Sequence, residues 1–185
     1  DELWFNQGDG TFVAGQVLTS SSRNHVLLAD FNDDDYLDIF GSTLGANSVW
    51  TNDQDGTFTL TSQSFGNDDT QAAAAGDLDG DGDLDVFLAH GNSGQVEDQV
   101  WLNDGLATFT QGFVSPIIEA SGSIALADID NDGDLDAITS SNGNHQIYTN
   151  TPPAPVISSL NTIVGTGSLA VLSESGVGPG TFTIT

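Results

Sequence analysis

Short apolar runs, rich in β-branched and aromatic residues, alternate along the chain with clusters of Asn, Asp and Gly. No stretch of useful length repeats an apolar residue with the 3.6-residue period of a helix. Short runs bounded by turn-forming residues are typical of β-strands. The pattern therefore predicts an all-β protein.

One hairpin-like pattern recurs along the chain. Its anchors are Trp4, Trp50, Trp101 and Tyr148, spaced by 46, 51 and 47 residues. Each anchor is followed two residues later by Asn, and the first two copies continue into Asp-Gly-Thr-Phe, which favours a tight hairpin turn. The copies read ELWFNQGDGTF (2–12), SVWTNDQDGTF (48–58), QVWLNDGLATF (99–109) and the truncated QIYTN (146–150).

A second, acidic block lies between these copies and repeats with the same period. Each full unit reads as a strand, an acidic loop, a strand, a strand with the aromatic anchor, a turn and a strand with Phe. Four short strands every 47 to 51 residues predict the blades of a β-propeller. Roughly 13 strands make little more than three blades, and a closed ring needs at least about four. We therefore expect an incomplete ring, completed by a longer polypeptide or by neighbouring chains.

The amino-acid composition of the chain changes after Asn150. Residues 151–156 contain three prolines and are predicted to form a stiff linker after the blades of residues 1–150. Residues 157–185 are poor in acidic side chains and are predicted to form a short β-rich segment, consistent with the start of an Ig-like sandwich. About 30 residues do not bury a core by themselves.

The acidic blocks have the spacing of a cation-binding loop. Oxygen-bearing side chains stand at positions 1, 3, 5 and 9 of each block, and alternate residues of a tight loop turn toward one centre. Position 7 would contribute its backbone carbonyl, Gly at position 6 permits a positive φ, and Leu at position 8 is expected to point into the blade. These spacings predict about three Ca²⁺ ions, with the ligands Asp30, Asn32, Asp34, Tyr36, Asp38, Asp77, Asp79, Asp81, Asp83, Asp85, Asp128, Asp130, Asp132, Asp134 and Asp136.

Two other calcium motifs fit the sequence less well. An EF-hand requires a bidentate Glu at position 12, where this chain has Gly41, Leu88 and Thr139, and it requires flanking helices. The Gly-rich nonapeptide period of calcium-binding β-rolls is absent. A merely solvated acidic turn would not keep the alternating register that ends in Leu-Asp in all three copies.

The three Asp-x-(Asp/Asn)-x-Asp-x-x-Leu-Asp loops and the Trp-x-Asn hairpins resemble the FG-GAP or VCBS-type repeats of integrin α-subunit propellers and bacterial surface proteins. The resemblance covers residues 1–150, and Ser64–Gly66 also contains a Phe-Gly pair. It implies that each loop binds calcium between the first two strands of a blade. The first loop departs from the other two at two positions. Asn32 lowers the charge of its ligands, and Asp35 replaces the glycine that favours the positive φ at position 6.

Charge narrows the range of partners. The chain has 27 acidic residues, a single basic residue and a formal net charge of −26, which three calcium ions would reduce to −20. Such a surface repels nucleic acid and anionic membranes. The longest apolar runs are far shorter than the about 20 residues of a membrane span, so no membrane insertion is expected. The chain has no cysteine, so it has neither disulfides nor thiol chemistry.

No catalytic constellation is recognisable, so we expect no enzyme activity and no catalytic residue. The dense carboxylate pairs all lie inside predicted ion loops, which makes them unavailable for acid–base work. His25, His90 and His145 share no spacing and are expected at strand edges or facing solvent. The recurring tryptophans are expected to pack between blades, with sugar stacking as the alternative.

These features favour a calcium-stabilised adhesion or structural module of a cell-surface or secreted assembly. Loops of this kind commonly bind calcium at about 10⁻⁴–10⁻³ M, which suits an extracellular location. One alternative is a carbohydrate-binding or enzyme-accessory propeller. Another is a subunit of an extracellular filament assembled by strand or blade complementation. The expected partner is accordingly a protein or glycan surface, or another copy of the chain.

Overall fold

The computed structural model describes residues 2–18, 23–43, 45–66, 69–91, 96–116, 120–141 and 144–151. The chain divides into two compact units, Asp1–Asn150 and Thr151–Thr185. Apart from Thr151, the predicted linker (151–156) and the predicted strand segment (157–185) lie outside the described residues. The fold described below is that of the first unit.

The described residues form thirteen β-strands, the number that the repeats predict, and no helix. It follows that this part of the chain holds no helix long and apolar enough to cross a membrane. The strands are β1 (Glu2–Asn6), β2 (Phe12–Val17), β3 (Arg23–Ala29), β4 (Asp38–Thr43), β5 (Ser48–Asn52), β6 (Phe58–Leu60), β7 (Thr70–Gly76), β8 (Asp85–His90), β9 (Gln99–Asn103), β10 (Phe109–Val114), β11 (Ser121–Ala127), β12 (Asp136–Ser141) and β13 (Asn144–Tyr148).

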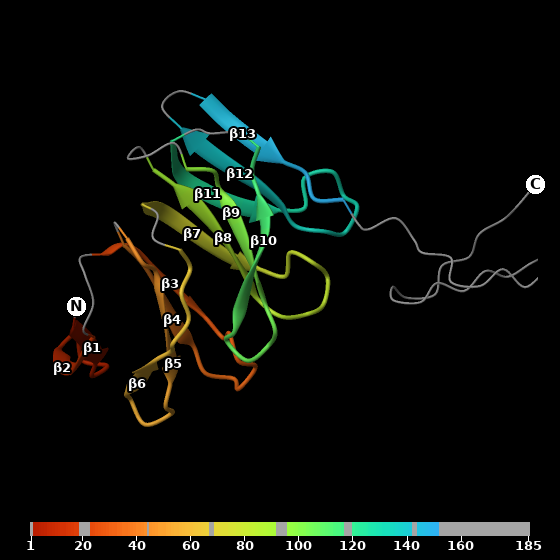
Figure 1. Cartoon of the computed structure of the whole chain (residues 1–185). Coiled ribbons are helices and arrows are strands. Elements are labelled where there is room, and N and C mark those ends of the chain that lie inside the picture. Colours follow the sequence, from red (N-terminus) through yellow and green to blue (C-terminus); the bar gives the residue numbers. More distant parts are fainter. Residues whose placement is uncertain are drawn as a thin grey trace, which may run out of the picture. The chain divides into compact units, whose positions relative to one another are not determined.

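Consecutive strands pair antiparallel in four separate sheets (Figure 1). We call β3–β6 blade 1, β7–β10 blade 2, and the three-stranded sheet β11–β13 blade 3; β1 and β2 form the N-terminal hairpin. The first strands β3, β7 and β11 contact one another in sequence, as the innermost strands of propeller blades do. The predicted fold, an incomplete set of four-stranded propeller blades, is confirmed.

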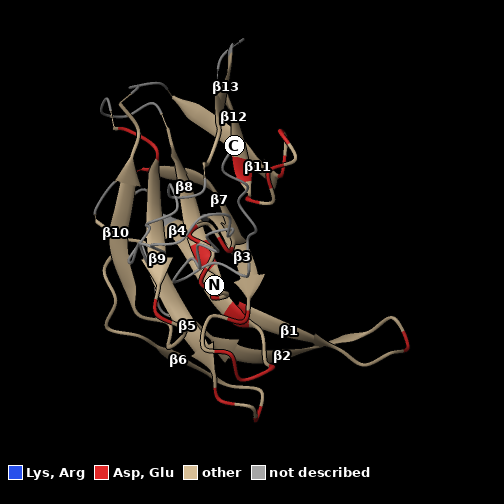
Figure 2. Ribbon diagram, turned by 90° about the vertical axis from the view of Figure 1, so that its right-hand side faces the viewer, with Lys and Arg blue, Asp and Glu red and all other residues tan. Residues whose placement is uncertain are grey.

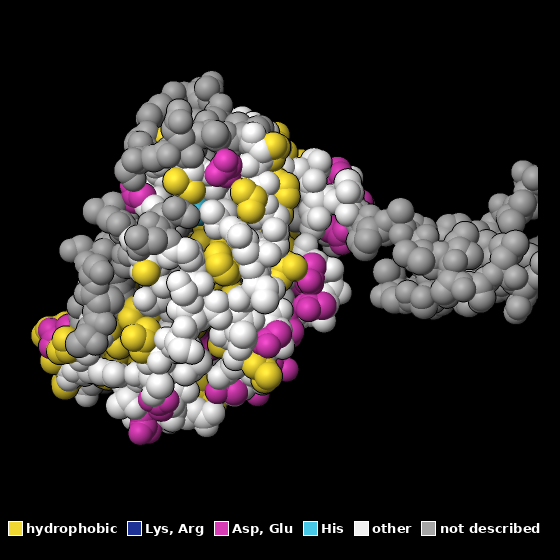
Figure 3. Space-filling view, viewed as in Figure 1, with side chains coloured by type: hydrophobic (Ala, Val, Ile, Leu, Met, Phe, Trp, Pro, Cys, Tyr) yellow, Lys and Arg dark blue, Asp and Glu magenta, His cyan; other side chains and the backbone are white. Residues whose placement is uncertain are grey.

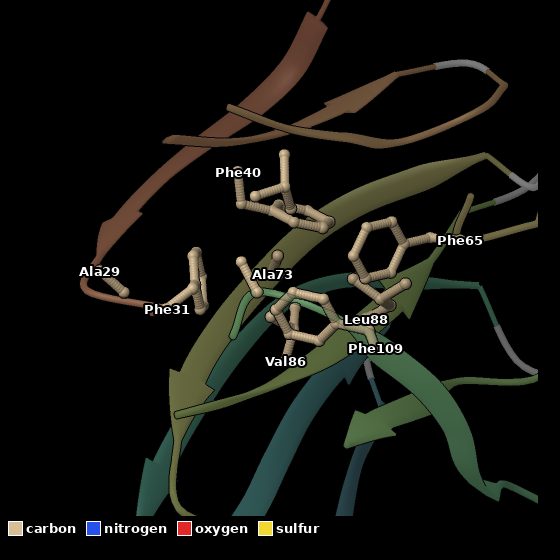
Figure 4. Close-up of a cluster of buried hydrophobic side chains, with 10 residues drawn as sticks. Ala29, Phe31, Phe40, Phe65, Ala73, Val86, Leu88 and Phe109 are labelled. Carbon is tan, nitrogen blue, oxygen red and sulfur yellow. The ribbon is translucent and has the colours of Figure 1, made fainter. Parts of the chain in front are cut away.

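The hydrophobic core lies between the sheets. Phe31 and Phe40 of blade 1 meet Phe109 of blade 2 in the largest cluster, where Phe65 also inserts (Figure 4). The rings pack edge to face: the Phe31 and Phe109 centroids are 5.4 Å apart at 77°, and those of Phe40 and Phe65 are 5.2 Å apart at 86°. Smaller clusters join the N-terminal hairpin to blade 1 and blade 2 to blade 3. Each sheet therefore covers a face of the next one.

The aromatic anchors occupy equivalent positions in this stack. Trp50, Trp101 and Tyr148 stand opposite residues of the second strand of their own blade, and all three face the preceding sheet. The prediction that the tryptophans pack between blades is confirmed for Trp50 and Trp101. Trp4 is exposed, because none of the described residues forms a sheet in front of the N-terminal hairpin.

The prediction for His90 was wrong. This residue ends β8, the second strand of a central blade, and it is completely buried. Its backbone N–H donates to Asp98 Oδ1 (2.9 Å), and its ring Nδ1 lies 2.8 Å from the Glu97 carbonyl oxygen. Its ring Nε2 is buried and makes no hydrogen bond with the described residues. His25 is half-buried and His145 is exposed, as a strand-edge location allows.

A glutamine joins neighbouring sheets at two equivalent places. The Gln16 amide donates to the Phe58 carbonyl oxygen (2.8 Å), and its Oε1 accepts the Phe58 N–H (2.7 Å). The Gln63 amide makes the same two bonds to Phe109, at 2.9 and 3.1 Å. Each pair of bonds therefore connects one sheet to the last strand of the next blade.

Candidate metal centres

The three acidic loops each connect the first and second strands of a blade. Loop 1 (30–37) lies between β3 and β4, loop 2 (77–84) between β7 and β8, and loop 3 (128–135) between β11 and β12. Figure 2 shows acidic residues concentrated in the connecting loops and at strand ends, while the bodies of the strands carry few. This is the placement that the repeat pattern predicts.

The loop backbone turns at positions 4 and 6. Gly82 and Gly133 at position 6 have φ values of 100° and 103°, as predicted, and Asp35 adopts the same region at 68°. Few residues other than Gly adopt a positive φ, and Asp is one of those that do so more often. Position 4 is also left-handed in every copy, at Asp33, Gly80 and Asn131.

The carboxylate at position 1 organises this turn. Asp77 accepts the N–H groups of Gly80 (2.7 Å) and Gly82 (3.1 Å). Asp30 likewise accepts the N–H groups of Asp34 (3.2 Å) and Asp35 (2.8 Å). The folded loop therefore holds the first acidic side chain inward, against its own backbone.

The carboxylate at position 9 closes the loop from the start of the second strand. Asp85 is completely buried; its Oδ2 accepts the Leu78 N–H and its Oδ1 the Asn103 N–H, both at 2.8 Å. The same two bonds recur at the equally buried residues Asp38 and Asp136. Position 9 therefore pins the loop to the aromatic strand of its blade, in addition to facing the loop centre.

Three carboxylates converge in loops 2 and 3. Positions 1, 3 and 9 each offer an oxygen, and these oxygens all lie within 4.8 Å of one another. The two groups are Asp77, Asp79 and Asp85 in loop 2, and Asp128, Asp130 and Asp136 in loop 3.

Positions 5 and 7 lie outside these groups. Asp81 at position 5 accepts the N–H of Asp83 at position 7 (3.0 Å), and Asp132 and Asp134 form the same bond (3.1 Å). A ligand role for the carboxylates at position 5 and for the carbonyls at position 7 stays a prediction.

Loop 1 offers a neutral amide where the others have a third carboxylate. Asn32 Oδ1 is buried and makes no hydrogen bond with the described residues, so it is an oxygen suited to a cation. Asp30, Asp34 and Asp38 supply the acidic positions. The side chain of Tyr36 at position 7 is exposed, and its N–H donates to Asp34 Oδ1 (2.9 Å).

The converging carboxylates repel one another. Burial, and to a smaller extent the charges of Asp79 and Asp81, raise the pKa of Asp85 to about 6 against the lowering effect of the two backbone N–H donors. Desolvation and the neighbouring Asp132 likewise raise the pKa of Asp130. The whole sequence holds one Lys or Arg, so side chains hardly neutralise these clusters. A proton or a bound cation is left to do so.

The sequence pattern missed the role of the Asn that follows each aromatic anchor. Asn103 Nδ2 donates to the carbonyl oxygen of Phe31, position 2 of loop 1 (2.9 Å), and Asn150 Nδ2 donates to that of Leu78, position 2 of loop 2 (2.8 Å). Asn103 and Asn150 therefore each tie their blade to the loop of the preceding blade. The recurrence of this Asn was visible, but its partner lies 72 residues away.

The prediction for position 8 was wrong in the first copy. Leu84 and Leu135 are partly buried against the preceding blade. Leu37 is exposed. The sheet before blade 1 consists of only β1 and β2 in the described chain, and it does not reach this position.

Antiparallel blades of three or four strands, each with an acidic loop between its first two strands, define a β-propeller repeat protein with candidate metal loops. A family model for the FG-GAP-like repeat matches residues 30–88 and 77–139, together more than half of the chain. The chain therefore belongs to the FG-GAP-like repeat family. Both matches begin at position 1 of an acidic loop and end in the second strand of the following blade. A search of curated proteins gives no match.

Proposed function

We propose that this chain is a calcium-stabilised extracellular module for adhesion or for building a cell-surface or secreted assembly. The observation that carries the proposal is the convergence of three carboxylates, one of them completely buried, in two equivalent loops of a chain with almost no basic side chains. Membership of a repeat family that often binds Ca²⁺ supports it.

The donor set suits calcium better than the other common metals. Every candidate ligand is an oxygen, whereas zinc and copper sites are built with His or Cys. Calcium accepts six to eight oxygens in flexible geometry, so backbone carbonyls and water can complete each loop. The expected occupancy is one ion per loop, held by positions 1, 3, 5 and 9 and the position 7 carbonyl.

Bound calcium would act on folding. The loop has its shape only in the folded chain, so a cation that binds there stabilises the folded state. At a free calcium concentration twenty times the dissociation constant, each site contributes about 2 kcal/mol. An affinity of about 10⁻⁴–10⁻³ M is filled outside cells and not in the cytosol, which favours an extracellular location and a protein or glycan surface as partner.

The direct test is a thermal melt with calcium, with magnesium and with EDTA. We expect EDTA to lower the melting temperature strongly and calcium to restore it more fully than magnesium. The paired substitution Asp77→Asn and Asp79→Asn should remove part of this response. Asp55→Asn is the control, because Asp55 lies in the exposed β5–β6 turn and bonds only to Thr57. A melting temperature that does not depend on calcium would refute the proposal.

A further inference from the structure

The stack of sheets has two end faces, and each exposes apolar side chains that its internal counterparts bury. Inside the stack, every sheet has a forward face, covered by the next sheet, and a backward face, which covers the preceding one. Blade 3 presents a forward face and the N-terminal hairpin presents a backward face that no described residue covers. The repeat register allows each exposed residue to be compared with its internal equivalents.

The forward face of blade 3 is built from isoleucines. Ile129 and Ile147 stand where blade 1 has Phe31 and Val49, which contact blade 2. Phe31 and Val49 are 1% and 0% exposed, whereas Ile129 and Ile147 are 38% and 52% exposed. The residues keep the apolar character of an internal face although no described sheet covers them.

The backward face of the N-terminal hairpin is aromatic. Trp4 stands where blade 1 has Trp50, and Phe12 stands where blade 2 has Phe109. Trp50 and Phe109 are 2% and 3% exposed and Phe58, the blade 1 equivalent of Phe12, is half-buried, whereas Trp4 and Phe12 are 56% and 57% exposed. Hydrophobic side chains accordingly gather on the surface over the hairpin (Figure 3). Large clustered aromatic residues on a surface mark an interaction site.

The two end faces also carry complementary polar groups. At both internal junctions that include a loop, an Asn Nδ2 reaches the position 2 carbonyl of the preceding blade, from Asn103 and from Asn150. The equivalent groups at the ends of the stack are Asn6 on the hairpin and the carbonyl of Ile129 on blade 3. One end therefore has the donor and the other the acceptor of the same inter-blade bond.

We propose that the Trp4–Phe12 face of one copy docks on the Ile129–Ile147 face of a second copy, head to tail. The docked pair repeats the internal blade contact, with Asn6 donating to the Ile129 carbonyl. The contact is heterologous, so it closes into a ring or propagates.

Electrostatics set the conditions for this association. Each copy carries a net charge of −26, so two copies repel one another at low ionic strength. Salt screens charges over about 10 Å at 0.1 M, and bound cations lower the charge itself. Association is therefore expected to strengthen with salt and with calcium, whereas a contact driven by ion pairs would weaken. This proposal does not depend on what the module binds.

The test is sedimentation velocity of the full chain over a range of concentrations, in calcium and moderate salt. We expect a mass of two copies or a larger multiple. Trp4→Ser and Ile147→Ser should each weaken association at least about tenfold, because buried apolar anchors dominate such contacts. Leu106→Ser is the matched control: Leu106 is 73% exposed but lies in the β9–β10 turn, away from both faces.

Mixing the two variants separates this arrangement from other modes of association. The Trp4→Ser chain retains its isoleucine face and the Ile147→Ser chain retains its aromatic face. An equimolar mixture should therefore form heterodimers that neither variant forms alone. Melting temperatures close to that of the wild type would show that both variants fold. A wild-type chain that stays monomeric at every concentration, or a mixture that stays monomeric, would overturn the proposal.

Discussion

Removing the amide of Gln63 should loosen the junction between blades 1 and 2. Phe109 lies opposite Asn103 on β9, and its own N–H and carbonyl oxygen both bond to Gln63. The amide therefore acts as a one-residue extension of the sheet. Gln63→Ala removes both bonds and leaves two partly buried backbone groups of Phe109 without their partner.

The expected loss follows from the bonds and the side-chain entropy. Two hydrogen bonds contribute about 2 kcal/mol, and the unpaired backbone groups add about 1 kcal/mol. Freeing an ordered Gln side chain recovers about 1 kcal/mol. We therefore expect Gln63→Ala to lower the free energy of unfolding by about 2 kcal/mol, or about 4–8 °C in melting temperature for a domain of this size.

Urea denaturation in saturating calcium measures this free energy without involving the metal loops. Gln63→Glu should lower the free energy of unfolding at least as much as Gln63→Ala at neutral pH. A carboxylate still accepts the Phe109 N–H, but it repels the Phe109 carbonyl oxygen. Gln16→Ala should reproduce the loss at the equivalent junction. Gln7→Ala is the control, since Gln7 bonds only within its own exposed hairpin. A Gln63→Ala variant within about 0.5 kcal/mol of the wild type would show that the two Gln63 bonds do not stabilise the junction.

Two further outcomes are expected from the loops themselves. Asp35→Gly should raise the stability by up to about 1 kcal/mol, since the φ of 68° favours the glycine found in loops 2 and 3, and a lower melting temperature would contradict this. In EDTA, the folded-state pKa of Asp85 is about 6 and its ordinary value is 3.8, so the folded chain binds this proton more tightly than the unfolded chain. The contribution of Asp85 to stability is then complete below pH 3.8 and is lost as the pH rises through 6. The melting temperature in EDTA should fall across that window, whereas a rise would count against the raised pKa.

Much of the fold could be predicted because the chain repeats. Four aligned copies of a short pattern identify the strands without any knowledge of contacts, and the alternating register identifies the loops. The left-handed conformation of Gly82 and Gly133 follows from the same pattern, since only the loop geometry explains glycine there. These are local features, and local sequence is sufficient to find them.

The predictions that were wrong and the roles that were missed all concern contacts between repeats. Burial of His90 depends on residues 97 and 98 and on the sheet that faces its side of β8, and exposure of Leu37 depends on a sheet of only two strands in front of it. The partners of Gln16 and Gln63 lie 42 and 46 residues away, beyond the reach of any periodic pattern. A repeat predicts what each unit contains, and the ends of the stack decide which of its faces stay exposed.

Position 2 of each acidic loop links the candidate metal centre to the stacking of blades. The Phe31 N–H donates to Asp38 at the bottom of loop 1, while the Phe31 carbonyl oxygen accepts Asn103 Nδ2 and the Ala107 N–H of blade 2. A cation that orders the loop would therefore also order the junction, without lying between the blades. In loop 3, the Ile129 N–H is held by Asp136, and its carbonyl belongs to the forward end face. Calcium in that loop would prepare this face for the second copy, so docking and calcium binding should strengthen each other.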